Sequence, residues 1–384
     1  MLRLTRCLHC VSQTRTFAAS AVSCGNRAIV YSSNGDPSST LFSRTFPSLP
    51  PPRANTVNVR FLLSPINPAD INVIEGVYPT KPAPFDLLGH AQAPVYVGGN
   101  EGLAEVVATG EGVTELKTGD WVIMTKSQTG TWTSARNIDA EDAMKVPSDL
   151  GEAAAATITV NPPTAYNMLH DYVQLDEGDW IVQNGANSAV GQAVIQIAAA
   201  RGWKTLNFIR NRENVESLNA YLNDLGATRV ITYDELSAKG FRETVKFWTG
   251  GKSIKLGLNC VGGRDTTSMM RLLGHDAHLV SYGAMSKEPL IIPTSLFIFK
   301  NVTCHGFWQG RWYREKSLQE RRQLTDALFG LMRDGKLRSP EHEVVVIKGA
   351  ETDEQARDKI SRVMDRLAGG MYGKKVLLKI EETP

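Results

Sequence analysis

The stretch from Trp180 to Gly191, Trp-Ile-Val-Gln-Asn-Gly-Ala-Asn-Ser-Ala-Val-Gly, decides the fold that this sequence predicts. A compact apolar strand runs into a turn of small residues, and the residues that follow are typical of a helix. Such a turn lets backbone N–H groups and the helix N-terminus meet a pyrophosphate. Gly185 and Gly191 are present, but Ser188 and Ala189 occupy middle positions that are often glycine. The loop predicts a dinucleotide site, with a turn that binds no ligand as the alternative.

The next strand indicates which dinucleotide is bound. A cofactor without a 2′-phosphate needs an Asp or Glu about 20 residues past the loop, where it accepts from the ribose hydroxyls. This chain instead has Arg210-Asn211-Arg212, 19 to 21 residues after Gly191. Two guanidinium groups can bind the dianionic 2′-phosphate of NADP(H). We therefore expect NADPH, with a solvated basic turn as the alternative.

Outward from this loop, short apolar strands alternate with helices. Because this alternation is typical of a parallel sheet covered on both faces, we expect a doubly wound Rossmann domain over 151–304. The expected strands are Trp180 to Gln183, Thr205 to Ile209, Arg229 to Thr232, Lys255 to Cys260 and His278 to Tyr282.

The residues before 151 have a different pattern, with strands and turns but few helices. Alternating polar and apolar residues predict half-buried strands of an antiparallel barrel. After about Cys304 we expect one charged helix, Arg314 to Arg333, and a last strand, Lys375 to Ile380. This tail is expected to return to the first domain, which then comprises 26–150 and 305–384. The expected early strands are Ala28 to Tyr31, Val57 to Leu63, Leu103 to Thr109 and Asp120 to Met124.

The N-terminal residues are typical of a mitochondrial transit peptide. Met1 to Phe17 contains three arginines, many Ser and Thr residues and no acid, and the first acidic residue is Asp36. We expect residues 1–25 to be removed in the mitochondrion, with a merely disordered N-terminus as the alternative. Without these arginines the 42 basic residues become 39 against 40 acidic ones, which disfavours nucleic acid as a partner. No apolar run approaches 18 residues, so no membrane-spanning helix is expected.

The five cysteines do not form a disulfide framework. Cys7 and Cys10 form a Cys-x-x-Cys pair inside the segment that is expected to be removed. Cys260 and Cys304 lie in apolar, strand-like runs, so we expect both thiols to be buried.

Barrel and cofactor motifs together resemble the medium-chain dehydrogenase/reductase superfamily over nearly all of the mature chain. The blocks Gly99-Asn-Glu-Gly102 and Lys117-Thr-Gly-Asp-Trp-Val122, with Gly110 between them, resemble its barrel signature. The resemblance implies a discontinuous GroES-like β-barrel catalytic domain and a Rossmann cofactor domain. No Cys lies between Cys24 and Cys260, and His90 lacks the Glu and thiolates of a zinc site, so we expect no metal.

Within that superfamily, several blocks resemble mitochondrial 2-enoyl thioester reductases. The resemblance implies NADPH-dependent reduction of trans-2-enoyl thioesters, carried by acyl carrier protein or coenzyme A, in mitochondrial fatty acid synthesis. It also implies a homodimer. A zinc-free quinone or enone reductase and a non-enzymatic NADP-binding protein are the alternatives. The blocks are Asn67 to Asn72, Gly76 to Pro82, Val160 to Tyr166, Asn259 to Gly263 and Gly306 to Trp308.

The resemblance also implies the roles of individual residues. Tyr78 matches the catalytic tyrosine, whose hydroxyl would stabilise the enolate or donate a proton; a ring that merely packs in a turn is the alternative. Ala284 replaces a frequent glycine, and the choice of Lys374 over Lys375 is one between neighbours. The cofactor-contacting positions are Asn161, Asn187, Ser188, Ala189, Val190, Arg210, Asn211, Arg212, Tyr282, Gly283, Ala284, Met285, Phe307, Trp308, Gln309 and Lys374.

A basic cluster after these blocks indicates a possible contact for the thioester carrier. It consists of Arg311, Arg314, Arg321 and Arg322, which could meet the phosphates of coenzyme A or an acidic carrier protein. Because Glu315 and Glu320 are interleaved, a solvated helix face is the alternative.

Overall fold

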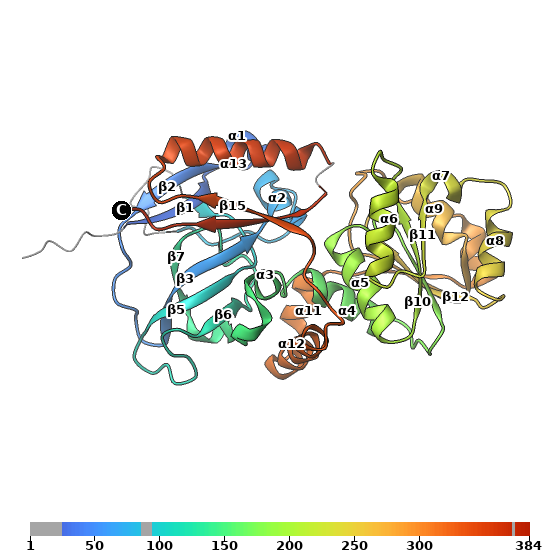
Figure 1. Cartoon of the computed structure of the whole chain (residues 1–384), viewed down its shortest axis with the longest axis horizontal. Helices are drawn as coiled ribbons and strands as arrows, with labels where there is room; N and C mark the ends of the chain where they lie inside the picture. Colours follow the sequence, from blue (N-terminus) through green and yellow to red (C-terminus); the bar gives the residue numbers. More distant parts are fainter. Residues whose placement is uncertain (1–24, 86–93, 371–372) are drawn as a thin grey trace, which may run out of the picture.

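The computed structural model describes residues 25–85, 94–370 and 373–384. They form two lobes, one holding both the N-terminal strands and the C-terminal tail, the other the middle of the chain (Figure 1). Residues 1–24 of the expected transit peptide, with Cys7, Cys10 and Cys24, and also His90 lie outside the described residues.

The middle lobe is the predicted doubly wound domain. Its six strands are all parallel, in the order β11-β10-β9-β12-β13-β14. β9 is buried along its whole length, as expected for a strand covered on both faces. The strands are β9 (Trp180–Gln183), β10 (Lys204–Ile209), β11 (Arg229–Thr232), β12 (Ile254–Asn259), β13 (Leu273–Ser281) and β14 (Thr303–Gly306). The helices are α5 (Ala189–Ala200), α6 (Val215–Asp224), α7 (Tyr233–Leu236), α8 (Phe241–Trp248), α9 (Gly263–Met270) and α10 (Thr294–Lys300).

The strand β14 is one edge of this sheet. It pairs with β13 as far as Gly306, so the expected boundary at 304 falls inside a strand. Cys260 is buried as predicted, but the prediction for Cys304 is wrong, because its thiol is exposed on this edge strand.

The first lobe contains two sheets. One has the order β2-β1-β4, and the other has the order β15-β16-β3-β5-β6-β8, with β7 also paired to β3. Because β16 pairs antiparallel with β3, the last strand of the chain lies in this lobe. The strands are β1 (Asn26–Tyr31), β2 (Phe42–Phe46), β3 (Thr56–Pro65), β4 (Tyr96–Val97), β5 (Leu103–Thr109), β6 (Trp121–Met124), β7 (Ala135–Asp139), β8 (Ala143–Lys145), β15 (His342–Ile347) and β16 (Lys375–Ile380), and the helices are α1 (Pro37–Thr40), α2 (Pro68–Glu75) and α13 (Asp353–Ala368).

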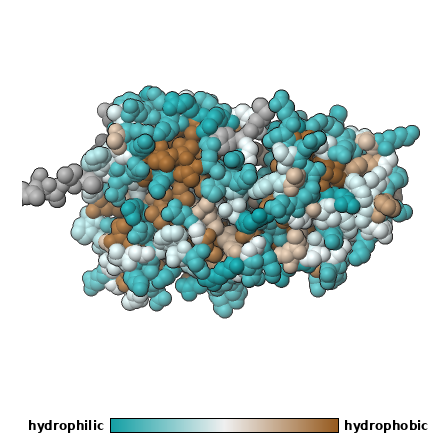
Figure 2. All heavy atoms as spheres, viewed as in Figure 1, coloured by the Kyte–Doolittle hydropathy of each residue, from teal (hydrophilic) through white to brown (hydrophobic). Residues whose placement is uncertain are grey.

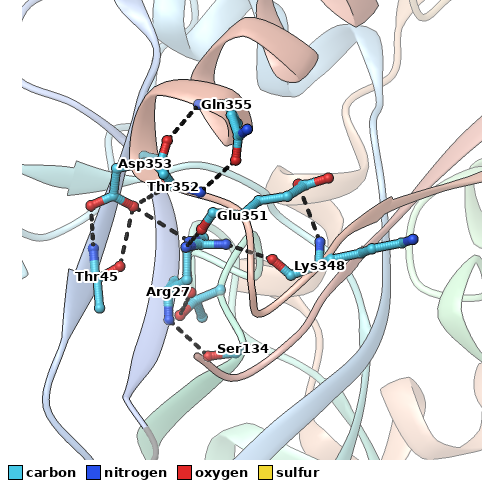
Figure 3. Close-up of polar contacts among 10 residues, drawn as sticks. Arg27, Thr45, Ser134, Lys348, Glu351, Thr352, Asp353 and Gln355 are labelled. Atoms are coloured by element: carbon cyan, nitrogen blue, oxygen red, sulfur yellow. Dashed lines mark hydrogen bonds and ion pairs between the residues drawn. The ribbon is translucent and has the colours of Figure 1, made fainter. Parts of the chain in front are cut away.

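A buried arginine joins the first strand of this lobe to the tail (Figure 3). Arg27 on β1 is 2% exposed, and its guanidinium donates to the backbone oxygens of Lys348 and Glu351. It also lies 3.4 Å from the carboxylate of Asp353 at the start of α13. A buried charge is tolerated only when it is paired and hydrogen-bonded, so these contacts fix the turn between β15 and α13 against β1.

Four helices lie where the two lobes meet: α3 (Glu152–Ala156), α4 (Asn161–His170), α11 (Gln309–Glu315) and α12 (Leu318–Arg333). The prediction of a single helix over Arg314 to Arg333 is wrong, because α11 ends at Glu315 and a new helix begins after Ser317. The Ser317 hydroxyl caps α12 by accepting from the N–H of Glu320 at 3.2 Å, and the Glu320 carboxylate accepts from the N–H of Ser317.

The surface in the same view is largely hydrophilic, with separate hydrophobic patches on the two lobes (Figure 2). Among the described residues, no helix is both long and apolar enough to cross a bilayer.

Candidate active site

Tyr78 stands just beyond the C-terminal end of α2. Gly76 ends this helix with φ of 82°, a conformation that favours glycine. The chain then folds back, so that the N–H groups of Val77 and Tyr78 both donate to the carbonyl of Asn72, at 3.0 and 3.2 Å. The helix end thereby fixes the backbone of Tyr78, whose side chain is half-buried.

The hydroxyl of Tyr78 meets an indole from the other end of the chain. Trp308, which follows β14, donates from Nε1 to Tyr78 Oη at 2.7 Å, and the two rings meet edge to face at 5.8 Å. Since the Tyr78 oxygen is the acceptor in this contact, its own proton stays available for another partner. Burial raises the pKa of Tyr78, so the hydroxyl is a neutral donor at physiological pH.

Part of the predicted basic cluster lies near this pair. The guanidinium of Arg314 covers the Trp308 ring at 4.6 Å from its centroid, and Arg311 donates to the Gly306 carbonyl at 3.0 Å. Arg314 therefore lies on the Trp308 ring, which in turn contacts Tyr78. Arg321 and Arg322 lie farther away along the chain, on α12, the next helix.

The dinucleotide loop has the close packing that its glycines require. Gly185 has φ of +58°, and a Cβ there would lie 2.5 Å from Cys260 Sγ. A Cβ on Gly191 would lie 2.6 Å from the Ala186 carbonyl oxygen. The hydroxyl of Ser188 caps α5 by accepting from the Gly191 N–H at 3.1 Å. The predicted residues from Asn187 to Val190 thus form the turn into a twelve-residue helix, where orphan N–H groups can meet an anion.

The turn after β10 holds two cations without a matching acid. Arg210 donates to the Gly370 carbonyl at 2.7 Å, and Asn211 donates to Asp234 at 2.8 Å. The Nε of Arg212 is buried and has no hydrogen-bond partner. Burial, and then the charge of Arg210, lower the pKa of Arg212. Because no carboxylate among the described residues pairs with either arginine, a dianionic phosphate fits this turn.

The remaining predicted positions on this lobe follow β13 and β14. Tyr282 donates its N–H to the Asn259 carbonyl and Met285 to the Cys260 carbonyl, both at 2.9 Å, and Gly283 and Ala284 between them are exposed. Burial raises the pKa of Tyr282 well above its ordinary value.

Phe307 and Gln309 flank Trp308, and both are buried. The side-chain oxygen of Gln309 accepts from Asn167 at 3.1 Å, while its Nε2 is buried without a partner. An unpaired buried donor is costly, so a group that accepts from Gln309 fits here.

Asn161, at the start of α4, belongs to a buried polar cluster that the sequence did not reveal. Its Nδ2 donates to Asn67 Oδ1 at 3.2 Å, and Asn67 Nδ2 donates to Glu101 Oε1 at 2.7 Å. The other Glu101 oxygen accepts from the backbone and hydroxyl of Thr159, at 3.2 and 3.1 Å. The one hint of this cluster in the sequence was Glu101, in the block Gly99-Asn-Glu-Gly102, but that block was interpreted only as part of a barrel signature.

The C-terminal lysines separate in the structure. Lys374 is exposed, whereas Lys375 donates from Nζ to Asn67 Oδ1. Burial lowers the pKa of Lys375, while it raises the pKa of Glu101 and raises that of Asp70 to about 7. The structure thus brings Lys375, and not its neighbour, into the cluster around Asn161.

No metal site accompanies this arrangement in the described part of the chain. Among residues 25–85, 94–370 and 373–384, no three His, Cys, Asp or Glu side chains lie close enough to hold an ion.

Comparisons with known proteins agree with the two-lobe architecture. Residues 53–166 match the model of the alcohol dehydrogenase GroES-like domain, and residues 189–325 match that of zinc-binding dehydrogenases. The solved complex of Etr1p with NADP and crotonyl-CoA superposes with a TM-score of 0.85 at 35% identity, covering 92% of this chain and 99% of that one. The heterodimer of mitochondrial 2-enoyl thioester reductase Etr1p/Etr2p from Candida tropicalis gives 0.84 at 36% identity, with the same coverage.

A curated relative is similar along most of the chain. The mitochondrial enoyl-[acyl-carrier-protein] reductase of Yarrowia lipolytica is 44% identical over 315 residues, which are 82% of this chain and 81% of the relative. At this identity and coverage, and with the same fold, the chain belongs to the family of mitochondrial enoyl-[acyl-carrier-protein] reductases.

Proposed function

We propose that this protein reduces the carbon–carbon double bond of trans-2-enoyl thioesters with NADPH. The observation that carries the proposal is the Tyr78 hydroxyl, whose oxygen accepts from Trp308 Nε1 at 2.7 Å. Its proton is thereby free at the junction of the two lobes. The relatives' names and the NADP and crotonyl-CoA in the Etr1p complex support the same reaction.

Tyr78 would act on the charge that develops on the substrate. NADPH, when bound, supplies a hydride to the β-carbon, and negative charge then develops on the thioester oxygen. A preorganised donor stabilises that charge more strongly in the transition state than in the ground state. The Tyr78 proton can serve as this donor and can pass, directly or through water, to the α-carbon. Trp308 keeps the phenol oriented meanwhile.

The residues of the Rossmann lobe would hold the cofactor. The turn from Asn187 to Val190 would bind the pyrophosphate at the N-terminus of α5, and Arg210 with Arg212 would bind the 2′-phosphate. The unpaired Arg212 Nε supports this placement. Toward the nicotinamide end we assign Asn161, Tyr282 to Met285, Phe307 to Gln309 and Lys374.

A Tyr78→Phe variant tests the reaction. Removing one such donor typically costs about 2.7 to 4 kcal/mol, so turnover of crotonyl-CoA should fall roughly a hundredfold to a thousandfold, with little change in NADPH affinity. Tyr96→Phe, at another half-buried tyrosine in the same lobe, is the matched control and should retain activity. Turnover of Tyr78→Phe within about threefold of wild type, or quinone reduction without enoyl thioester reduction, would refute the proposal.

We further propose that two copies pair through the edge of the Rossmann sheet. Among the described residues, β14 pairs on one side only, with β13. Beside it on α10, Phe297, Ile298 and Phe299 are 41%, 68% and 72% exposed. An apolar face beside an open strand edge favours self-association, and the related Etr1p/Etr2p pair is a heterodimer of similar chains.

Light scattering tests the dimer. Ile298→Glu should give a monomer, because a charge would be buried in the interface. Phe247→Glu is the control, since Phe247 is 83% exposed on α8 and should leave the mass unchanged. A monomeric wild type, or a dimer that survives Ile298→Glu, would contradict this assembly.

The mitochondrion is the proposed location. The relatives are named mitochondrial, and no acid precedes Asp36. A reporter fused to residues 1–26 should enter mitochondria, and changing Arg3, Arg6 and Arg15 to Glu should keep it in the cytosol. A cytosolic wild-type fusion would refute the assignment.

A further inference from the structure

The side-chain amide of Asn67 is held between two opposite charges. Its Nδ2 donates to Glu101 Oε1 at 2.7 Å, and its Oδ1 accepts from Lys375 Nζ. Asn67 is 2% exposed and Glu101 is fully buried, so water cannot replace these partners. The three residues come from the start of α2, the segment before β5 and the start of β16.

These charges leave Asn67 a single amide orientation. Both Glu101 carboxylate oxygens accept hydrogen bonds here, one from Asn67 and the other from Thr159, and the Lys375 Nζ donates its bond. The NH₂ of Asn67 must therefore face Glu101 and its oxygen must face Lys375. The reversed amide would set oxygen against the carboxylate and NH₂ against the ammonium, so two repulsive contacts would replace two hydrogen bonds.

The orientation of Asn67 passes to Asn161. Because Asn67 presents its oxygen, Asn161 has to present its NH₂, and its Nδ2 does donate to Asn67 at 3.2 Å. The Asn161 oxygen is left for another partner, and no described residue donates to it. Asn161 lines a small cavity together with Ala189 and Gln192 at the N-terminus of α5, next to the dinucleotide loop.

We propose that Glu101 and Lys375 are positioning residues for the cofactor: through Asn67 they hold the Asn161 amide with its oxygen toward bound NADPH, where it accepts a hydrogen bond. The Glu101 carboxylate itself is held by Asn67 and Thr159. Its effect on NADPH rests on the proposed function, because Asn161 is assigned to the cofactor there.

A double-mutant cycle tests the coupling through NADPH dissociation constants measured by titration calorimetry. Glu101→Gln removes one of the two charges that impose the orientation of the Asn67 amide, so the reversed amide becomes far less costly. Glu101→Gln and Asn161→Ala should each weaken NADPH about tenfold or more. The double variant should bind no more weakly than Asn161→Ala alone, because no amide is left to orient.

Two further variants separate orientation from stability. Asn67→Ala removes the middle residue of the hydrogen-bond series from Glu101 to Asn161. Like Glu101→Gln, it should weaken NADPH and cause no further loss in combination with Asn161→Ala. The test therefore stays available if Glu101→Gln does not fold. Thr131→Val is the matched control, because the buried Thr131 hydroxyl donates to the backbone oxygen of Glu101 at 2.7 Å and does not touch its carboxylate. This variant should lower the melting temperature and leave NADPH affinity within about twofold.

Two results would overturn the inference. If the losses from Glu101→Gln and Asn161→Ala multiply in the double variant, Glu101 does not act through Asn161. If Asn161→Ala alone leaves NADPH affinity unchanged, the Asn161 oxygen has no role in binding. Turnover of crotonyl-CoA by the wild type tests the proposed reaction separately, so neither of these two results decides whether that reaction occurs.

Discussion

The two arginines after β10 should decide between NADPH and NADH. Arg212→Ala removes a guanidinium whose Nε has no partner in the protein, so the fold loses little. Arg210→Ala removes in addition one exposed hydrogen bond, to the Gly370 carbonyl at 2.7 Å. Both changes therefore act mainly on the ligand, and the 2′-phosphate is the group that distinguishes the two cofactors.

The size of the effect follows from the contacts that each arginine can make. A hydrogen bond to a charged group contributes about 1.5 to 3 kcal/mol, which is roughly a tenfold to hundredfold change in affinity. In the double variant, the fold loss of NADPH affinity should be smaller than the product of the two single losses. Its arginines share one phosphate, and removing either relieves the repulsion that lowers the pKa of Arg212.

Dissociation constants for both cofactors, measured at one fixed ionic strength, test this expectation. NADPH should weaken in each variant, while NADH should stay within about twofold. Arg229→Ala is the control, because Arg229 lies on neighbouring β11 with its guanidinium over the Trp248 ring at 5.4 Å. Equal losses for the two cofactors would refute the 2′-phosphate assignment.

Three other expectations concern packing, pH and metal. Gly191→Ala should destabilise the fold by about 1 to 3 kcal/mol, because its Cβ would lie 2.6 Å from a backbone oxygen. Gly330→Ala, in open space on α12, should instead stabilise the fold by about 0.4 to 1 kcal/mol. Denaturant melts that show equal shifts for the two variants would contradict this. Asp70, with its pKa raised by burial to about 7, keeps its proton in the folded state while the unfolded chain loses it near pH 4. Wild-type stability should therefore fall relative to Asp70→Asn as pH rises from about 4 to 7 and level off above, and a constant difference in urea midpoints between pH 5 and 8 would disprove it. Activity should survive prolonged chelation, and zinc that tracks with activity in elemental analysis would overturn the metal-free assignment.

Local patterns in the sequence predicted most of the Rossmann lobe. The strand, small-residue turn and helix around Gly185 and Gly191 depend on neighbours within a few residues, and β9 and β11 have the predicted bounds. Such local patterns did not predict that the thiol of Cys304 is exposed. An edge strand and a central strand have similar compositions, and only the order of strands in the sheet distinguishes them.

The same limit applies to the site. Sequence indicated Tyr78 and Trp308 as separate motifs, but their hydrogen bond joins residues 230 positions apart. Lys375 meets Asn67 across 308 positions, and one residue of register decides that Lys375 and not Lys374 turns inward. Hydrophobic period, capping and turn chemistry act over a few residues, so the sequence by itself determined the elements, the cofactor turn and the identity of the reactive groups. The partners of those groups, and hence the direction in which each hydrogen bond runs, depend on which distant segments the tertiary structure packs together.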